Sequence, residues 1–203
     1  SNEILAKLNR APGESLATAG DRYLDAHGSL SVECTYQSPP NIEWDDQTYL
    51  GDAYPCYAWA VDVVEVSVDL DTAHVTIDHL TTSQDAGRVL HRVLCEGQIE
   101  GGTLQGLGFA TSEEVVVRDG RMLNDRLTNY IIPTALDAPE MVVGLVEASF
   151  PYGPFGAKGI GEMPLDGVAP AVVAAVEHAL GHTVPDTIPL TPERLMESMG
   201  EKS

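Results

Sequence analysis

Basic residues are scarce in this chain of 203 residues. There are 11 lysines and arginines against 31 aspartates and glutamates, which gives a formal net charge of −20. Nucleic-acid binding relies on clustered Lys and Arg, and so does adhesion to an anionic membrane. The composition therefore argues against both kinds of partner. A charge of this size favours solubility or suits a cytoplasm of high salt, and composition does not separate these two explanations.

Cysteine is scarce as well, and long apolar runs are absent. Cys34, Cys56 and Cys95 are odd in number, widely spaced and form no Cys-x-x-Cys pair. A disulfide framework, a zinc site or an iron–sulfur site on this chain is therefore not expected. No apolar run approaches the roughly 20 residues of a membrane helix, and no signal-peptide pattern is found. We expect a cytoplasmic protein without a membrane segment.

The hydrophobic content of 43% is enough for one sizeable core or for two small lobes. Hydrophobic spacing predicts an α+β fold in which antiparallel hairpins pack with helices. Predicted helices cover residues 4–8, 16–24, 89–114 and 169–180, with a short one after Thr191-Pro192; predicted strands cover 30–36, 64–70, 75–80, 115–117, 121–123 and 141–148. We expect a first domain over residues 1–50, with helices, a strand and a connecting loop, and a second over 51–203.

Two glycine-rich segments stand out in the second domain. Gly153-Pro-Phe-Gly-Ala-Lys-Gly-Ile-Gly-Glu162 places four glycines around Lys158, so its main chain can approach a polar ligand without side-chain obstruction. The spacing fits neither a P-loop nor a dinucleotide-binding fingerprint. The second segment, Gly97 to Gly108, lies in a predicted helix although each interior glycine costs about 1 kcal/mol there. Its glycines serve either close helix packing or the approach of a bulky ligand.

These motifs resemble those of the molybdenum hydroxylases, the family of xanthine dehydrogenases and aldehyde oxidoreductases. The resemblance covers residues 51–199 and is carried, in the same order, by Gly97-Gln-x-Glu-Gly-Gly-x-x-Gln-Gly-x-Gly108, Ile132-Pro-Thr134, Gly156-Ala-Lys-Gly-Ile-Gly-Glu162 and Leu190-Thr-Pro-Glu-Arg-Leu195. His91-Arg92 stands where the family has Asn-Pro. The family's molybdenum-binding part is several times longer, so we expect a separately encoded subunit or an excised fragment.

The resemblance implies one lobe of a larger molybdenum-binding assembly that hydroxylates an aldehyde or N-heterocycle with water-derived oxygen. Residues 51–203 would be its molybdopterin-binding C-terminal domain, and the cofactor's form, the cytosine dinucleotide among them, is left open. Glu162 matches the catalytic base, while Gln98, Lys158, Gly159, Ile160 and Gly161 match positions along the cofactor; no direct metal ligand is expected on this chain. Expected partners are the missing N-terminal molybdenum-binding half, an iron–sulfur subunit and a subunit carrying FAD.

Ordinary structural roles remain open for the same residues. Glu162 could be an acid favoured at a helix start, Gln98 a surface residue, and Lys158 the partner of one of many carboxylates. A non-catalytic assembly subunit that keeps the fold is the alternative to the enzyme.

Overall fold

The computed structural model describes residues 2–200. The chain separates into two compact units, Ser1–Ile42 and Glu43–Ser203, whereas the sequence suggests a domain boundary at residue 50. Each unit is described by itself.

The first unit contains the two helices that the sequence predicts, α1 (Asn2–Leu8) and α2 (Leu16–His27). Ser15 caps α2, because its hydroxyl accepts a hydrogen bond from the Thr18 amide, and Gly28 with φ 75° ends it. The strand predicted at residues 30–36 is wrong, since this segment has no regular structure and its side chains are mostly exposed. The alternating pattern is present, but no strand pairs with the segment.

The second unit is built on a sheet of β3 (Ala60–Val68), β4 (Val75–Asp85) and β7 (Glu140–Val146), in the order β3-β4-β7. β3 and β4 form the predicted antiparallel hairpin, with Val64 opposite Leu80. β7 pairs parallel to β4, with Met141 beside Leu80. The hairpins of the predicted α+β fold are therefore present, but the sheet is mixed. Parallel neighbours need a long crossover, and a helix lies within this one.

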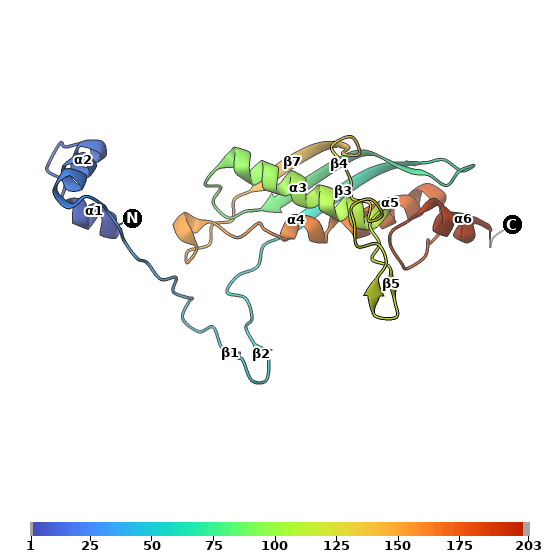
Figure 1. Cartoon of the computed structure of the whole chain (residues 1–203), viewed down its shortest axis with the longest axis horizontal. Coiled ribbons are helices and arrows are strands. Elements are labelled where there is room, and N and C mark those ends of the chain that lie inside the picture. The colour runs from blue at the N-terminus through green and yellow to red at the C-terminus, as the bar shows by residue number, and fades with distance from the viewer. Residues whose placement is uncertain (1, 201–203) are drawn as a thin grey trace. The chain divides into compact units, whose positions relative to one another are not determined.

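Helices cover one face of this sheet. α3 (Arg92–Thr111), which lies between β4 and β7 in the chain, runs along this face (Figure 1). α5 (Val168–Leu180) packs on β3. The short α4 (Met163–Asp166) lies against α3, and α6 (Pro192–Gly200) follows near the C-terminus. Gly181 ends α5 in the left-handed conformation, as the sequence predicts. No helix among residues 2–200 is both long and apolar enough to cross a membrane.

The core between sheet and helices has two apolar clusters. The larger contains Leu80, Leu107, Val168 and Val172, and the smaller contains Ala86, Cys95 and Ile99. Polar side chains on the inner face of the sheet and on α3 lie between the two clusters: Asp62, Thr82, Gln84 and Thr103.

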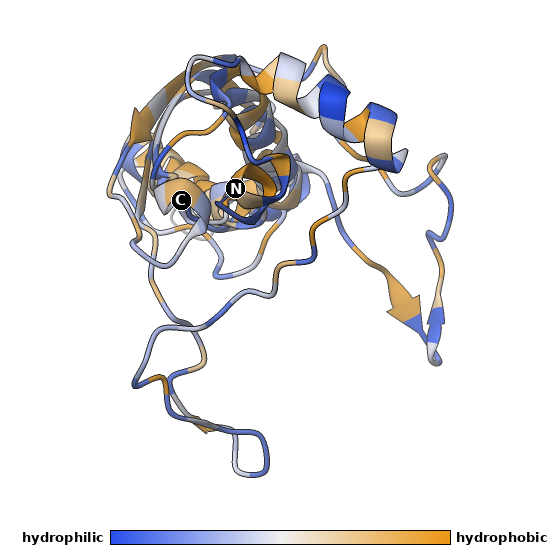
Figure 2. Ribbon diagram, turned by 90° about the vertical axis from the view of Figure 1, so that its left-hand side faces the viewer, coloured by the Kyte–Doolittle hydropathy of each residue, from blue (hydrophilic) through white to orange (hydrophobic). Residues whose placement is uncertain are grey.

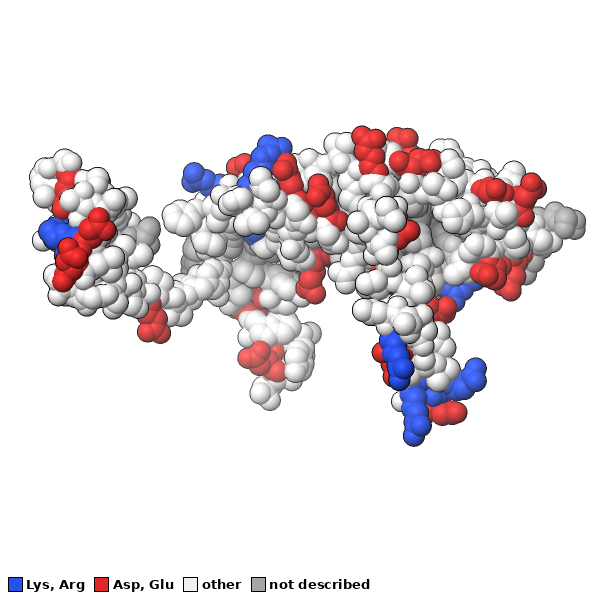
Figure 3. Space-filling view, turned by 45° about the horizontal axis from the view of Figure 1, so that its top comes forward, with Lys and Arg blue, Asp and Glu red and all other residues white. Residues whose placement is uncertain are grey.

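Two small hairpins complete the unit. β1 (Trp44–Asp45) pairs with β2 (Leu50–Gly51), and β5 (Val117–Arg118) pairs with β6 (Arg121–Met122). Positive φ angles at Asp119 and Gly120, 51° and 73°, form the predicted turn between β5 and β6. This hairpin extends from the packed body and mixes apolar with polar residues (Figures 1 and 2). It also gathers arginines, whereas acidic groups are scattered over the rest of the displayed face (Figure 3).

Candidate functional site

The glycine-rich loop of residues 153–162 is tied to the end of β4. The Gly156 carbonyl accepts hydrogen bonds from the amides of Arg88 at 2.8 Å and Phe150 at 3.0 Å, and the Lys158 amide donates to Ala86 O at 3.0 Å. Gly156 has φ 90°, and a Cβ there would overlap the Ser149 hydroxyl, so this position requires glycine. The loop is therefore held in one place although it has little regular structure.

Lys158 forms a buried ion pair with Asp85. Its Nζ lies 2.6 Å from Asp85 Oδ2 and 3.0 Å from the Tyr57 carbonyl, and the two charged side chains are 10% and 5% exposed. Asp85 also accepts hydrogen bonds from the amides of Gly87 and Ala148. Burial raises the pKa of the Asp85 carboxyl, but these hydrogen bonds and the lysine charge outweigh it and leave that pKa below its ordinary value. The ammonium of Lys158 thus joins the loop to β4.

Beyond Lys158 the loop exposes its main chain. The Ile160 side chain packs against the cluster of Ala86, Cys95 and Ile99, which anchors this stretch. Within residues 2–200, the amides of Gly159, Ile160 and Gly161 donate to no acceptor. A Cβ at Gly159 or Gly161 would meet no atom within 4 Å. Only the main chain of these three residues is therefore available to a ligand.

Gln98 connects the two glycine-rich motifs. Its Nε2 donates to the Gly161 carbonyl at 2.9 Å, across a sequence separation of 63 residues. The glycines of α3 divide into two groups. Cβ atoms at Gly97 and Gly101 would face open space, whereas one at Gly102 would lie 2.9 Å from Pro164 and one at Gly106 2.8 Å from the Leu165 carbonyl. Close helix packing therefore explains Gly102 and Gly106, whereas Gly97 and Gly101 are open, and the approach of a ligand there stays a prediction.

Glu162 follows directly and occupies the N-cap position of α4. Its side chain caps nothing and is exposed, and its carboxylate makes no hydrogen bond or ion pair with any described residue. A capping side chain would accept hydrogen bonds from the free amides there, and Glu162 accepts none. The carboxylate of Glu162 is therefore available for another group.

His91, which stands at the departure from the family pattern, begins α3. Its Nδ1 accepts a hydrogen bond from the Leu94 amide at 3.3 Å. The imidazole thus caps the helix, and α3 begins at Arg92, three residues later than its sequence pattern suggests.

One cavity of this unit lies beside the candidate site. This cavity of about 210 Å³ adjoins the glycine-rich loop and is lined by Cys95, Lys158 and Ile160 among others. Burial raises the pKa of the Cys95 thiol, which makes it unsuited to act as a nucleophile.

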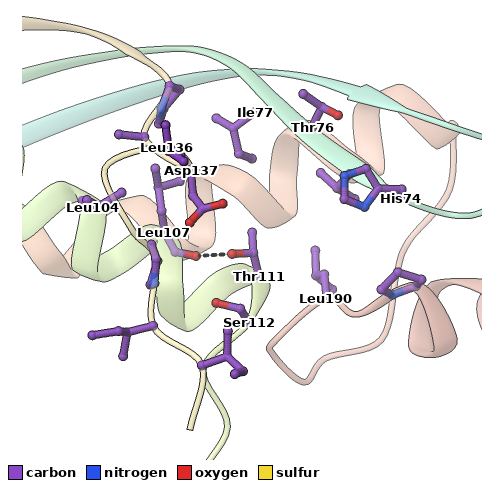
Figure 4. Close-up of a pocket in the computed structure, with 17 residues that line it drawn as sticks. His74, Thr76, Ile77, Leu104, Leu107, Thr111, Ser112, Leu136, Asp137 and Leu190 are labelled. Atoms are coloured by element: carbon purple, nitrogen blue, oxygen red, sulfur yellow. Dashed lines mark hydrogen bonds between the residues drawn. The ribbon is translucent and has the colours of Figure 1, made fainter. Parts of the chain in front are cut away.

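The larger cavity, about 460 Å³, lies elsewhere, between β4, the C-terminal half of α3 and residues 131–139 (Figure 4). Its carboxylate, Asp137, accepts hydrogen bonds from the amide and hydroxyl of Thr134, which lower its pKa. The Asp137 carboxylate thus stabilises the turn of residues 134–137. Two of the motifs quoted above contribute to its lining, through Ile132 and Pro133 and through Leu190 and Pro192. The cavity itself is not evident from the sequence, because its other lining residues are distant along the chain.

A family model described as the molybdopterin cofactor-binding domain matches residues 3–139. The chain belongs to this family.

Several relatives are similar to this chain over most of its length. A xanthine dehydrogenase molybdenum-binding subunit of Escherichia coli O157:H7 is 33% identical over 198 residues, covering 94% of this chain and 24% of the relative. The aldehyde oxidoreductase of Megalodesulfovibrio gigas is 32% identical, covering 97% and 21%. The chain therefore spans about a quarter or less of the relatives' length.

Solved structures of oxidoreductases match the fold of this chain. The aldehyde oxidoreductase of Desulfovibrio desulfuricans ATCC 27774 matches with a TM-score of 0.73 and 26% identity, over 97% of this chain and 21% of that one. Quinoline 2-oxidoreductase of Pseudomonas putida 86 matches with a TM-score of 0.63 and 37% identity, over 67% and 18%. The chain thus has the fold of one part of a molybdenum hydroxylase.

The residues present suit a molybdopterin. A pterin offers ring nitrogens and carbonyl groups, and its phosphate offers acceptor oxygens. The free amides of Gly159 to Gly161 can donate to such acceptors. The glycine positions facing open space would let a flat ring approach the main chain closely.

Proposed function

We propose that this chain supplies one wall of the molybdopterin site of a molybdenum hydroxylase, with Glu162 as its catalytic base. The observation that carries the proposal is the hydrogen bond from Gln98 to the Gly161 carbonyl. This bond joins the two motifs beside Glu162, whose carboxylate has no partner within residues 2–200. When bound, the molybdenum cofactor supplies the redox chemistry by which water-derived oxygen enters the substrate.

Different residues of the chain would have different roles in holding the cofactor. The amides of Gly159, Ile160 and Gly161 would donate hydrogen bonds to it. Gln98 fixes the loop through its Nε2 and keeps its amide oxygen as an acceptor. Lys158 acts as a positioning residue, because its ammonium is committed to Asp85.

Glu162 takes the proton of the attacking water. A carboxylate oxygen with a free lone pair can accept this proton, and the Glu162 side chain is exposed and makes no hydrogen bond or ion pair with the described residues. Once the rest of the subunit covers the site, the same carboxylate lies away from bulk water.

The substrate we propose is a small aldehyde or an N-heterocycle. The names of the relatives refer to xanthine, aldehydes and quinoline, which belong to these two classes. The remaining part of the molybdenum-binding subunit would complete the site, and iron–sulfur and FAD-carrying chains would remove the electrons.

The test is Glu162→Gln in the assembled complex, with turnover and molybdenum content measured on the same preparation. The amide keeps the shape but cannot accept a proton, so turnover should fall roughly 10²–10⁴-fold while molybdenum stays at the parent level. Glu197→Gln, an exposed glutamate of α6, is the control and should keep its turnover. Full turnover in molybdenum-replete Glu162→Gln would reject the catalytic role and favour the assembly subunit.

A further inference from the structure

A polar layer divides the core of the second unit. The apolar cluster with Leu80 and Leu107 lies on one side of this layer, and the cluster with Ala86 and Ile99 lies on the other. Polar side chains are rarely buried without hydrogen-bond partners, so a layer of this kind calls for a physical reason.

The layer's members on the sheet lie side by side. Asp62 of β3 pairs in register with Thr82 of β4. The Gln84 Nε2 donates to Thr82 Oγ1 at 2.6 Å, which brings the Gln84 amide to the same place. Asp62 Oδ2 lies against Gly167, between α4 and α5, where an added Cβ would overlap it.

Thr103 joins the layer from α3. It lies one helical turn from Ile99 and one from Leu107, so the three side chains share one face of the helix. Since Ile99 packs in one cluster and Leu107 in the other, the buried Thr103 lies between the two clusters along α3.

Three oxygen atoms in this layer are buried and unpaired among the described residues: Asp62 Oδ1, Gln84 Oε1 and Thr103 Oγ1. The Gln84 and Thr103 residues are both 0% exposed. Burial raises the pKa of Asp62, and a hydrogen bond from Thr82 opposes this rise only in part. No lysine, arginine or histidine within residues 2–200 forms an ion pair with Asp62.

We propose that this layer is a binding site for a monovalent cation, Na⁺ or K⁺, held by Asp62 Oδ1, Gln84 Oε1 and Thr103 Oγ1. The donors are all oxygen, which suits a hard cation and not a thiolate- or imidazole-seeking metal. They carry one negative charge, which a single positive charge balances, whereas calcium sites usually gather several carboxylates.

A path and a driving force for entry are both present. Asp62 is only partly buried, and its strand β3 lies at the edge of the sheet. The net charge of −20 attracts cations to the surface. The site lies in the core and is independent of the proposed catalytic function.

Thermal unfolding of the full chain tests the proposal. The melting temperature should be about 2–4 °C higher in NaCl or KCl than in choline chloride of equal ionic strength, because only the small cations bind the folded state. Equal ionic strength removes general screening of the acidic surface. Equal melting temperatures in all three salts would overturn the proposal and leave water as the occupant.

Matched variants locate the effect. Thr103→Val keeps the shape and removes one ligand, so it should abolish the difference between KCl and choline chloride; Thr81→Val, on the opposite face of β4, should retain it. A salt effect that Thr103→Val leaves intact would reject this site.

A second measurement does not depend on a variant that folds. Crystals of the full chain grown with thallium(I) in place of K⁺ should show an anomalous difference peak close enough to Asp62 Oδ1 for direct coordination. Density without an anomalous signal there would overturn the proposal.

Discussion

At the scale of single residues, the structure changes the interpretation of Lys158 most. Its sequence position leaves open a cofactor contact or a carboxylate partner, and its ammonium lies in a buried pair with Asp85. A motif identifies which residue matters, whereas the direction of a side chain depends on partners such as Asp85, 73 residues away. The loop's free amides at 159–161 are invisible in sequence for the same reason.

Removing one partner of this buried pair should be costly. Lys158→Met leaves Asp85 charged and buried, so we expect the free energy of unfolding to fall by about 3–5 kcal/mol in denaturant titration. Arg92→Met breaks an exposed pair with Glu96 and should change stability by less than about 1 kcal/mol. Similar losses in the two variants would show that the Lys158 pair contributes no more than a surface pair.

The Asp85 carboxyl also predicts a pH dependence. Its pKa is lowered in the folded state, so its stabilisation is present above the unfolded-state pKa of about 3.9 and is lost as pH falls further, through the folded pKa. Asp85→Asn should therefore be less stable at neutral pH and should lose less stability on acidification. Parallel curves of unfolding free energy against pH for the two proteins would contradict this assignment.

At the scale of elements, the sequence predicts those turns and helix ends that depend only on neighbouring residues. The Asp119-Gly120 turn and the end of α5 at Gly181 depend on neighbouring residues, and both are confirmed. The strand at 30–36 and the parallel pairing of β7 depend on a distant partner, which alternation does not reveal. The four-residue α4 is too short to have a periodic pattern.

The glycines of α3 give a matched pair of substitutions. Gly101→Ala meets open space and should stabilise the chain by up to about 1 kcal/mol, since alanine favours a helix. Gly106→Ala puts a Cβ 2.8 Å from the Leu165 carbonyl and 3.0 Å from Val168 Cβ, and should cost about 1–3 kcal/mol. Denaturant unfolding separates them, and equal effects would show that packing does not distinguish the two positions.

Gly101→Ala also tests the cofactor face. If the open glycines admit a ligand, the substitution should lower the molybdenum content of the assembled complex although the chain itself is more stable. Unchanged molybdenum content would show that the cofactor does not approach α3 at this turn.

At the scale of the whole molecule, the uncovered surfaces match a chain that spans about a quarter of its relatives. The outer face of the sheet exposes Val61 at 64%, Val63 at 56%, and Val142 and Val146 at 48%. The β5–β6 hairpin exposes Val117 at 62%. Several large apolar side chains exposed on one face of a sheet are typical of an interface. We expect the rest of the molybdenum-binding subunit to cover these faces.

The purified chain should therefore contain no molybdenum. Its candidate site offers an open wall of main-chain amides and one amide side chain, and a large cofactor needs enclosure on several sides to be retained. Co-expression with the remaining part of the subunit should give a co-purifying complex that holds the metal. Metal analysis of both preparations checks this. Stoichiometric molybdenum in the isolated chain would mean that this wall alone binds the cofactor, and separate elution of the two parts would mean that the exposed valines face another partner.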